Sequence, residues 1–246
     1  MKFLNLKHIV PIILLTFLFS FKGDAQKIYF WLDAGLKVQA GSGLLYNNNL
    51  INDRDIDPKF GFVYGFGGKF GFNFGDYHAL TIDGLYSVVT QENRLKSDNV
   101  DAFDKRLTFN AIDLYAMYRY NRNLNYVELG VKYSIYQKFL QSIDGGTADL
   151  VDDDYVDNML SPVLGFGYYM FNQDAFTVNL GFRLSYGIND LLSNQGIEKE
   201  VFTAPIQYDS YSTTNPGLIE LVLEFNFGLG QYAKSVCGKR ASFMGL

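Results

Sequence analysis

The stretch FGFVYGFGGKFGFNF at residues 60–74 decides the fold class. Its even-numbered positions are aromatic except for Gly68, whereas its odd-numbered positions are glycine or polar except for Val63. Because a β-strand sends alternate side chains to opposite faces, this stretch predicts a strand with one aromatic face and one small or polar face. In a small closed barrel the small, polar face fits the inside, and the aromatic face points outward, where only lipid accepts it.

The same alternation recurs along the chain and predicts an all-β fold. We expect an eight-stranded antiparallel up-and-down transmembrane β-barrel with strands at residues 27–40, 60–74, 77–90, 107–120, 126–140, 160–171, 176–188 and 217–229. Short turns rich in Gly, Asp and Asn alternate with long polar stretches at 41–58, 91–106, 141–159 and 189–216. Short turns at one end and long loops at the other are typical of an outer-membrane barrel. A hairpin around residues 201–211 would instead make ten strands.

A soluble, lipocalin-like barrel is the main alternative fold. Such a barrel keeps apolar residues inside and polar residues outside. Eight strands enclose room for modest side chains only, and the phenylalanine column of residues 60–74 would overfill that lumen. The pattern therefore favours the membrane barrel.

The first 25 residues read as a secretory signal peptide. Lys2 and Lys7 precede an apolar run at residues 9–21, and the small residues before Gln26 form a cleavage site that ends at Ala25. The expected domain boundaries are a signal peptide at 1–25, the barrel at 26–230 and a short periplasmic tail at 231–246.

Net charge and cysteine content narrow the function classes. The formal charge is −5, and removal of Lys2, Lys7, Lys22 and Asp24 with the signal peptide leaves about −7. An acidic chain argues against nucleic acid as a partner. The single cysteine, Cys237, excludes an intramolecular disulfide framework.

Charged residues on the inward faces predict a network inside the lumen. Its expected members are Asp33, Lys37, Lys69, Asp83, Asp113, Arg119, Glu128, Lys132, Arg183, Glu220 and Glu224. We expect Lys37 to pair with Glu220, and Arg119 with Glu128. Because buried charges must be paired, mixed signs favour a plug that fixes the register of the barrel. The alternative is a gated or narrow pore with selectivity set by the charges.

An acidic stretch marks the third long loop. It contains Asp144, Asp149, Asp152, Asp153, Asp154 and Asp157 with no intervening Lys or Arg. Clustered carboxylates suit Ca²⁺, although the spacing does not match an EF-hand. The open alternatives are a solvated flexible loop, a loop ordered by Ca²⁺, and a loop bridged by divalent cations to lipopolysaccharide phosphates.

Catalysis is disfavoured by the histidine count. The mature chain has one histidine, His78, which the topology places beside a short periplasmic turn. A histidine at the extracellular rim, the usual general base of enzymatic barrels, is missing. No phosphate loop or Cys/His cluster suggests a cofactor, so we expect a protein that is not an enzyme.

The strand pattern, the signal peptide, and Gly/aromatic runs such as Phe60-Gly61-Phe62 and Gly165-Phe166-Gly167-Tyr168 resemble the small outer-membrane barrel domain shared by OmpA-like and PorT-like proteins. The resemblance is one of pattern and covers almost the whole mature chain. It implies a structural barrel or, in the PorT branch, an accessory of the type IX protein secretion system. We expect no peptidoglycan-binding domain like that of full-length OmpA-like proteins, and residues 231–246 form a basic tail after the last expected strand.

These observations predict a protein of the outer membrane of a Gram-negative bacterium, in contact with lipid and lipopolysaccharide. The leading expectation is a structural or accessory subunit that binds an envelope protein through its long loops or outer wall. A narrow channel for small solutes or ions is the alternative, and an enzyme at the rim is disfavoured.

Overall fold

The computed structural model describes residues 30–52, 56–75, 77–97, 100–172, 176–199 and 210–229. The expected signal peptide, the expected tail with Cys237 and most of the candidate hairpin at 201–211 lie outside these residues. No helix in the described ranges is both long and apolar enough to cross a membrane.

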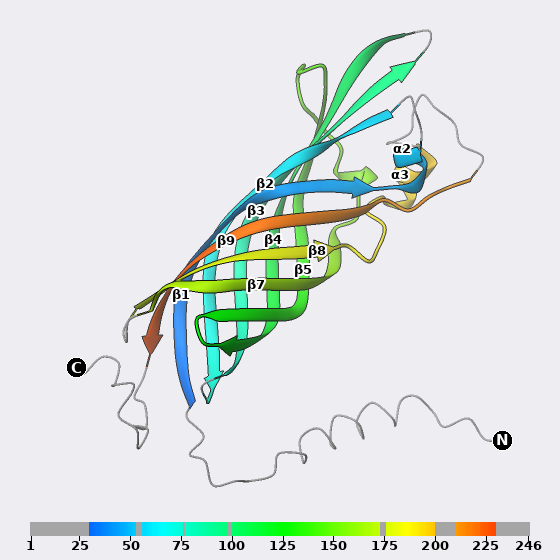
Figure 1. Ribbon diagram of the computed structural model, residues 1–246. Helices are drawn as coiled ribbons and strands as arrows, with labels where there is room; N and C mark the ends of the chain where they lie inside the picture. The colour runs from blue at the N-terminus through cyan, green and yellow to red at the C-terminus, as the bar shows by residue number, and fades with distance from the viewer. Residues whose placement is uncertain are drawn as a thin grey trace, which may run out of the picture.

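Antiparallel strands make up most of the described chain (Figure 1). The long strands are β1 Phe30–Tyr46, β2 Ile56–Phe74, β3 His78–Ser97, β4 Val100–Arg122, β5 Asn125–Ile143, β7 Asn158–Asn172, β8 Phe176–Tyr186 and β9 Asn215–Leu229. The short elements are α2 Asn48–Asn52, β6 Asp149–Leu150, the 3-10 turn η1 Asp152–Asp154 and α3 Asn194–Glu198.

The long strands close into a ring. Each pairs with its neighbour along the chain, and β1 pairs with β9 from Leu32 opposite Leu229 to Tyr46 opposite Asn215. The two-residue β6 only adds to the edge of β5. Among the described residues the ring therefore has eight strands, and the expected fold class is confirmed.

The two faces of the wall are divided as the alternation predicts. On β1, Leu36 is 64% exposed while its neighbour Lys37 is fully buried. On β2, Phe62 is 59% exposed while Val63 is fully buried. Continuous apolar exposure around a closed barrel is stable only in contact with lipid, so the barrel spans a membrane.

The strands run further toward the long-loop end than expected. The stretch 91–106, predicted to be a loop, instead continues β3 to Ser97 and begins β4 at Val100, and this β3–β4 hairpin projects beyond the rest of the barrel (Figure 1). Likewise, β1 and β2 take up half of the expected loop 41–58. In the part of the hairpin whose side chains are described, polar residues lie on both faces: Gln91 and Asn93 are buried, whereas Arg94 and Arg106 are exposed. This part therefore lacks the apolar alternation that marks the strands in the membrane.

A β-bulge changes the direction of side chains near the end of β5. Ala111 of β4 lies opposite Tyr136, whereas Asn110 lies opposite Lys138, which leaves one extra residue on β5. A bulge reverses the inward and outward positions that follow it. Alternation continued from Lys132 and Ser134 predicts that Lys138 faces the lumen, but Lys138 is exposed and Phe139 is buried instead.

Candidate functional site: the filled lumen and its cap

Four cations and four carboxylates form one ion-pair cluster in the half of the lumen nearer the short turns. Its members are Lys37, Lys69, Arg119, Arg183, Asp33, Asp83, Glu128 and Glu224, which are all linked by nitrogen–oxygen contacts of 3.4 Å or less. Most of these side chains are almost completely buried. Equal numbers of opposite charges allow the cluster to remain ionised inside the barrel, since unpaired buried ions would cost several kcal/mol each.

Glu224 lies at the centre of this cluster. Its carboxylate is 2.7 Å from the Lys37 ammonium, 2.7 Å from the Arg119 guanidinium and 3.4 Å from the Lys69 ammonium. It also accepts a hydrogen bond of 3.2 Å from the Asn179 amide. The strands β1, β2, β4, β8 and β9 are thus joined across the lumen through one side chain.

The predicted pairing of Lys37 with Glu220 is wrong. Lys37 contacts Asp83 at 2.5 Å and Glu224 at 2.7 Å, and not Glu220. The reason is the register in which β1 closes on β9, because Lys37 lies opposite Glu224 and Gly41 lies opposite Glu220.

The expected pair of Arg119 and Glu128 is present, with a closest contact of 2.5 Å. The two residues lie opposite each other on β4 and β5. Arg119 also stacks over the ring of Tyr126 at 4.1 Å. Tyr126 is 3% exposed and its ring fills the lumen here. It therefore does not belong to a ring of aromatic side chains on the outer surface of the barrel.

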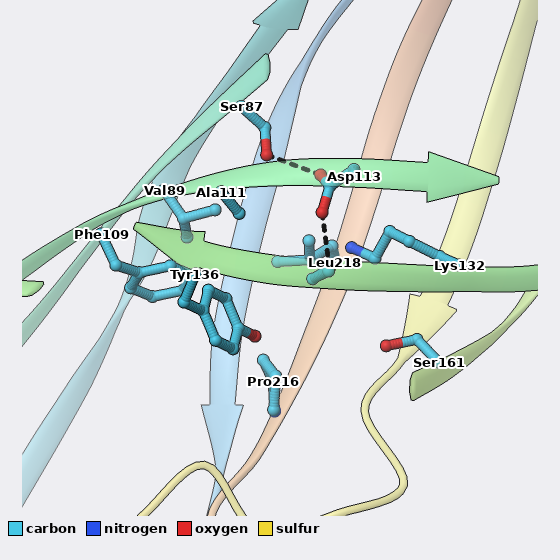
Figure 2. Close-up of a pocket in the computed structure, with 11 residues that line it drawn as sticks. Ser87, Val89, Phe109, Ala111, Asp113, Lys132, Tyr136, Ser161, Pro216 and Leu218 are labelled. Carbon is cyan, nitrogen blue, oxygen red and sulfur yellow. Dashed lines mark hydrogen bonds between the residues drawn. The ribbon is translucent and has the colours of Figure 1, made fainter. Parts of the chain in front are cut away.

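A second group of charges lies further toward the loops. Asp113 accepts hydrogen bonds from Ser87 and Ser134 at 2.6 and 2.5 Å (Figure 2). Glu220 accepts one from Gln39 at 2.8 Å. The Lys132 ammonium lies 6.0 Å from the ring of Tyr115. The sequence predicts Asp113 as a member of one lumen network, but hydroxyl groups hold its carboxylate and no ion pair joins it to the cluster among the described residues.

A small cavity lies beside this second group. It has room for about one water molecule. Its lining mixes polar and apolar side chains, as Figure 2 shows: Ser87, Val89, Phe109, Ala111, Asp113, Lys132, Ser134, Tyr136, Ser161, Pro216 and Leu218. The cavity therefore marks the boundary between the charged half of the lumen and an apolar half.

An apolar plug fills the loop-side half of the lumen. Its buried members are Leu45, Leu50, Ile56, Val63, Val89, Leu107, Phe109, Phe139, Tyr155, Met159, Leu191, Leu192 and Leu218. Inward-facing strand residues meet residues from the connections, and the rings of Phe139 and Tyr155 stack at 4.3 Å. Sequence analysis missed this plug, because it described the lumen by its charges alone. The signal was the change to Leu, Val and Phe at inward positions near the loops.

The connections form a cap over the plug, which we define as residues 47–52, 144–157, 187–199 and 210–214. The Asn47 amide donates to the Thr214 hydroxyl at 2.8 Å, and the Leu191 amide donates to the Thr214 carbonyl at 2.9 Å. Burial, with a smaller contribution from Asp154, raises the pKa of the Tyr155 hydroxyl, which stays neutral. The cap is thus packed and hydrogen-bonded into the barrel.

The six aspartates of the acidic stretch do not converge on one point. Asp152 accepts the backbone N–H of Phe139 at 2.6 Å, and Asp154 pairs with Lys199 at 2.7 Å. Asp144 accepts the backbone N–H of Asp104 at 2.8 Å. In the described part of the chain, no group of three or more His, Cys, Asp or Glu side chains could hold a metal ion. Three of the six carboxylates therefore help to order the acidic stretch through contacts within the protein. The binding of Ca²⁺ by this stretch remains a prediction from the sequence.

His78 lies at the short-turn end of β3. Its Nδ1 is 2.6 Å from the hydroxyl of Tyr118, and its ring stacks on that tyrosine. Both side chains face outward with the apolar wall. The structure brings no carboxylate or hydroxyl nucleophile of the lumen to this histidine.

Comparisons with known proteins found similarity to solved barrel structures only. No family model matches the chain, and no curated protein matches it. The chain is similar to the Neisserial surface protein A, NspA, with 14% identity and a TM-score of 0.44 over 78% of this chain and 95% of that one. It is similar to Ail, the attachment invasion locus protein of Yersinia pestis, with 12% identity and a TM-score of 0.35 over 79% and 98% of the two chains. It is also similar to the outer membrane protein OprG from Pseudomonas aeruginosa, with 13% identity and a TM-score of 0.36 over 82% and 96%. At these identities and scores, the roles of those proteins are not transferred to this chain.

Proposed function

We propose that this chain is a small barrel of the outer membrane of a Gram-negative bacterium that acts through its surface rather than by transport. The observation that supports this proposal is the filled lumen. The ion-pair cluster occupies one half, and the apolar plug under its cap occupies the other. A solute would have to break both layers to pass.

The surface available for such a role includes the cap and the projecting β3–β4 hairpin. The cap is held by hydrogen bonds such as that from Asn47 to Thr214, and the hairpin is held by the pairing of β3 with β4. Four large apolar side chains of the described cap are exposed, Ile51 at 40%, Leu150 at 61%, Ile188 at 53% and Tyr211 at 52%. We therefore propose a structural or accessory subunit whose cap binds another envelope protein.

Affinity purification in mild detergent tests this role. The tagged wild-type chain is expected to recover one envelope protein in stoichiometric amount. A variant with Leu150→Asn and Tyr211→Asn is expected to lose it. A control variant with Leu124→Asn, at an apolar residue that is 54% exposed in a short turn, is expected to retain it. Recovery of the barrel alone, or equal loss in both variants, would contradict binding through the cap.

A narrower assignment follows from the resemblance to PorT-like proteins and from nothing else. It makes the partner a component of the type IX secretion system. Deletion of the gene would then reduce the secretion of type IX cargo, and the wild-type chain would restore it. Normal cargo secretion in the deletion strain would remove this assignment and leave the broader role intact.

A further inference from the structure

Four cations lie together on the outer wall at the loop-side end of β2, β3, β4 and β5. They are Lys59, Arg94, Arg106 and Lys138. The side chains of Lys59, Arg94 and Arg106 are 37%, 47% and 55% exposed. Lys138 is exposed because the bulge in β5 turns it out of the lumen. On the outward faces of β1, β7, β8 and β9, the described residues include no Lys or Arg.

This cationic patch borders the lipid-facing wall. Lys59 adjoins Phe60, which is 76% exposed, and Phe62, which is 59% exposed. Ile135 is the last outward-facing apolar residue before the bulge in β5, and Lys138 lies three positions further along the chain. The cations therefore occupy the level at which the apolar surface ends and lipid headgroups begin.

The described contacts leave one cation of the patch without a carboxylate partner. Asp104 pairs with Lys59 at 3.1 Å and with Arg94 at 4.0 Å, and Glu92 pairs with Arg106. Lys138 has no hydrogen bond or ion pair among the described residues. Asp57 lies opposite Arg94 in the register of β2 and β3, and Asp144 accepts the backbone N–H of Asp104. Lys138 therefore supplies the positive charge that is free to meet an anion.

We propose that this patch binds the phosphate groups of lipids in the leaflet that faces the loops. Cations close to an anionic lipid surface contribute about 1 kcal/mol each, and guanidinium groups bind phosphate through paired hydrogen bonds. The lipid class is a phosphorylated glycolipid such as lipid A, whose acyl chains would lie against the phenylalanines of β2. This inference rests on the proposed placement in the outer membrane.

Lys138 allows a clean test, because its replacement leaves no carboxylate unpaired. The delipidated mature chain is titrated in neutral detergent with lipid A and with dephosphorylated lipid A, and native mass spectrometry gives the apparent Kd for each. We expect tighter binding of the phosphorylated lipid. Lys138→Gln weakens that binding about fivefold, and Lys138→Arg restores it. Arg122→Gln, which removes one exposed cation at the opposite end of the barrel, leaves binding unchanged.

Several results would overturn the proposal. Equal affinity for the two lipids would show that phosphate is not recognised. Equal loss in Lys138→Gln and Arg122→Gln would show an effect of overall charge. Competition by millimolar inorganic phosphate would indicate a site for free anions rather than for a lipid. None of these results depends on whether the lumen conducts, so failure here is distinguishable from failure of the proposed function.

Discussion

Glu224 is the residue on which the ion-pair cluster depends most, because three cations contact its carboxylate. Glu224→Gln removes one negative charge and leaves the buried cations in excess. We expect the free energy of unfolding, measured by urea titration in lipid vesicles, to fall by about 3–5 kcal/mol. Glu198→Gln, at an exposed position of α3, is the matched control and is expected to change it by less than about 0.5 kcal/mol. A fall of similar size in both variants would contradict the central role of Glu224.

Gly41 is required by the close approach of β1 and β9. A Cβ atom added there would lie 2.0 Å from the carbonyl oxygen of Ile219, which is backbone and cannot move aside easily. We expect Gly41→Ala to lower the free energy of unfolding by about 1–3 kcal/mol in the same titration.

Gly84→Ala serves as the control for Gly41→Ala. A Cβ atom at Gly84 would meet only the Leu114 side chain, at 3.9 Å. Alanine also restricts the unfolded chain more than glycine does, so Gly84→Ala is expected to be neutral or slightly stabilising. If Gly41→Ala unfolded at the same urea concentration as Gly84→Ala, the closing register of β1 on β9 would be in doubt.

At the scale of single elements, the cap is expected to be separable from the barrel. Leu191 is fully buried in the apolar plug, and Leu191→Ala removes contacts worth about 2–5 kcal/mol. Because the strands are hydrogen-bonded independently of this residue, the loss should open the cap locally. We expect faster proteolysis within residues 144–157 while the barrel still migrates as a folded species in cold gel electrophoresis.

Leu150→Ala is the control for the cap, since Leu150 is 61% exposed and lies outside the plug. It is expected to leave the proteolysis rate unchanged. Unfolding of the whole barrel by Leu191→Ala would show instead that cap and barrel form one cooperative unit.

The sequence predicts the strands well where lipid is on one side and the lumen on the other. The expected ends of β2, β8 and β9 at the short turns agree with the structure within one residue. It fails at the loop-side ends, because Gln91 and Asn93 face inward while Glu92 and Arg94 face outward, and such a segment looks like a loop. The bulge that turns Lys138 outward also leaves no local signal.

The candidate site shows the same division. All eleven residues expected in the lumen do face it, because inward position follows from alternation within a strand. Their partners do not follow from alternation. The contact of Lys37 with Glu224 depends on the register between the first and last strands, which is set by the whole ring rather than by either segment. The apolar plug likewise depends on how three separate connections fold back.

In the whole molecule, the ion-pair cluster and the apolar plug together block the lumen. The most direct test is single-channel recording of the purified mature chain in planar bilayers, alongside Asp113→Asn, whose side chain lies beside the lumen cavity. We expect that neither protein produces steady current steps, because the ion-pair cluster and the apolar plug both close the path. Steady steps in the wild type whose size or ion selectivity changes with Asp113→Asn would contradict this expectation and would show a conducting pore.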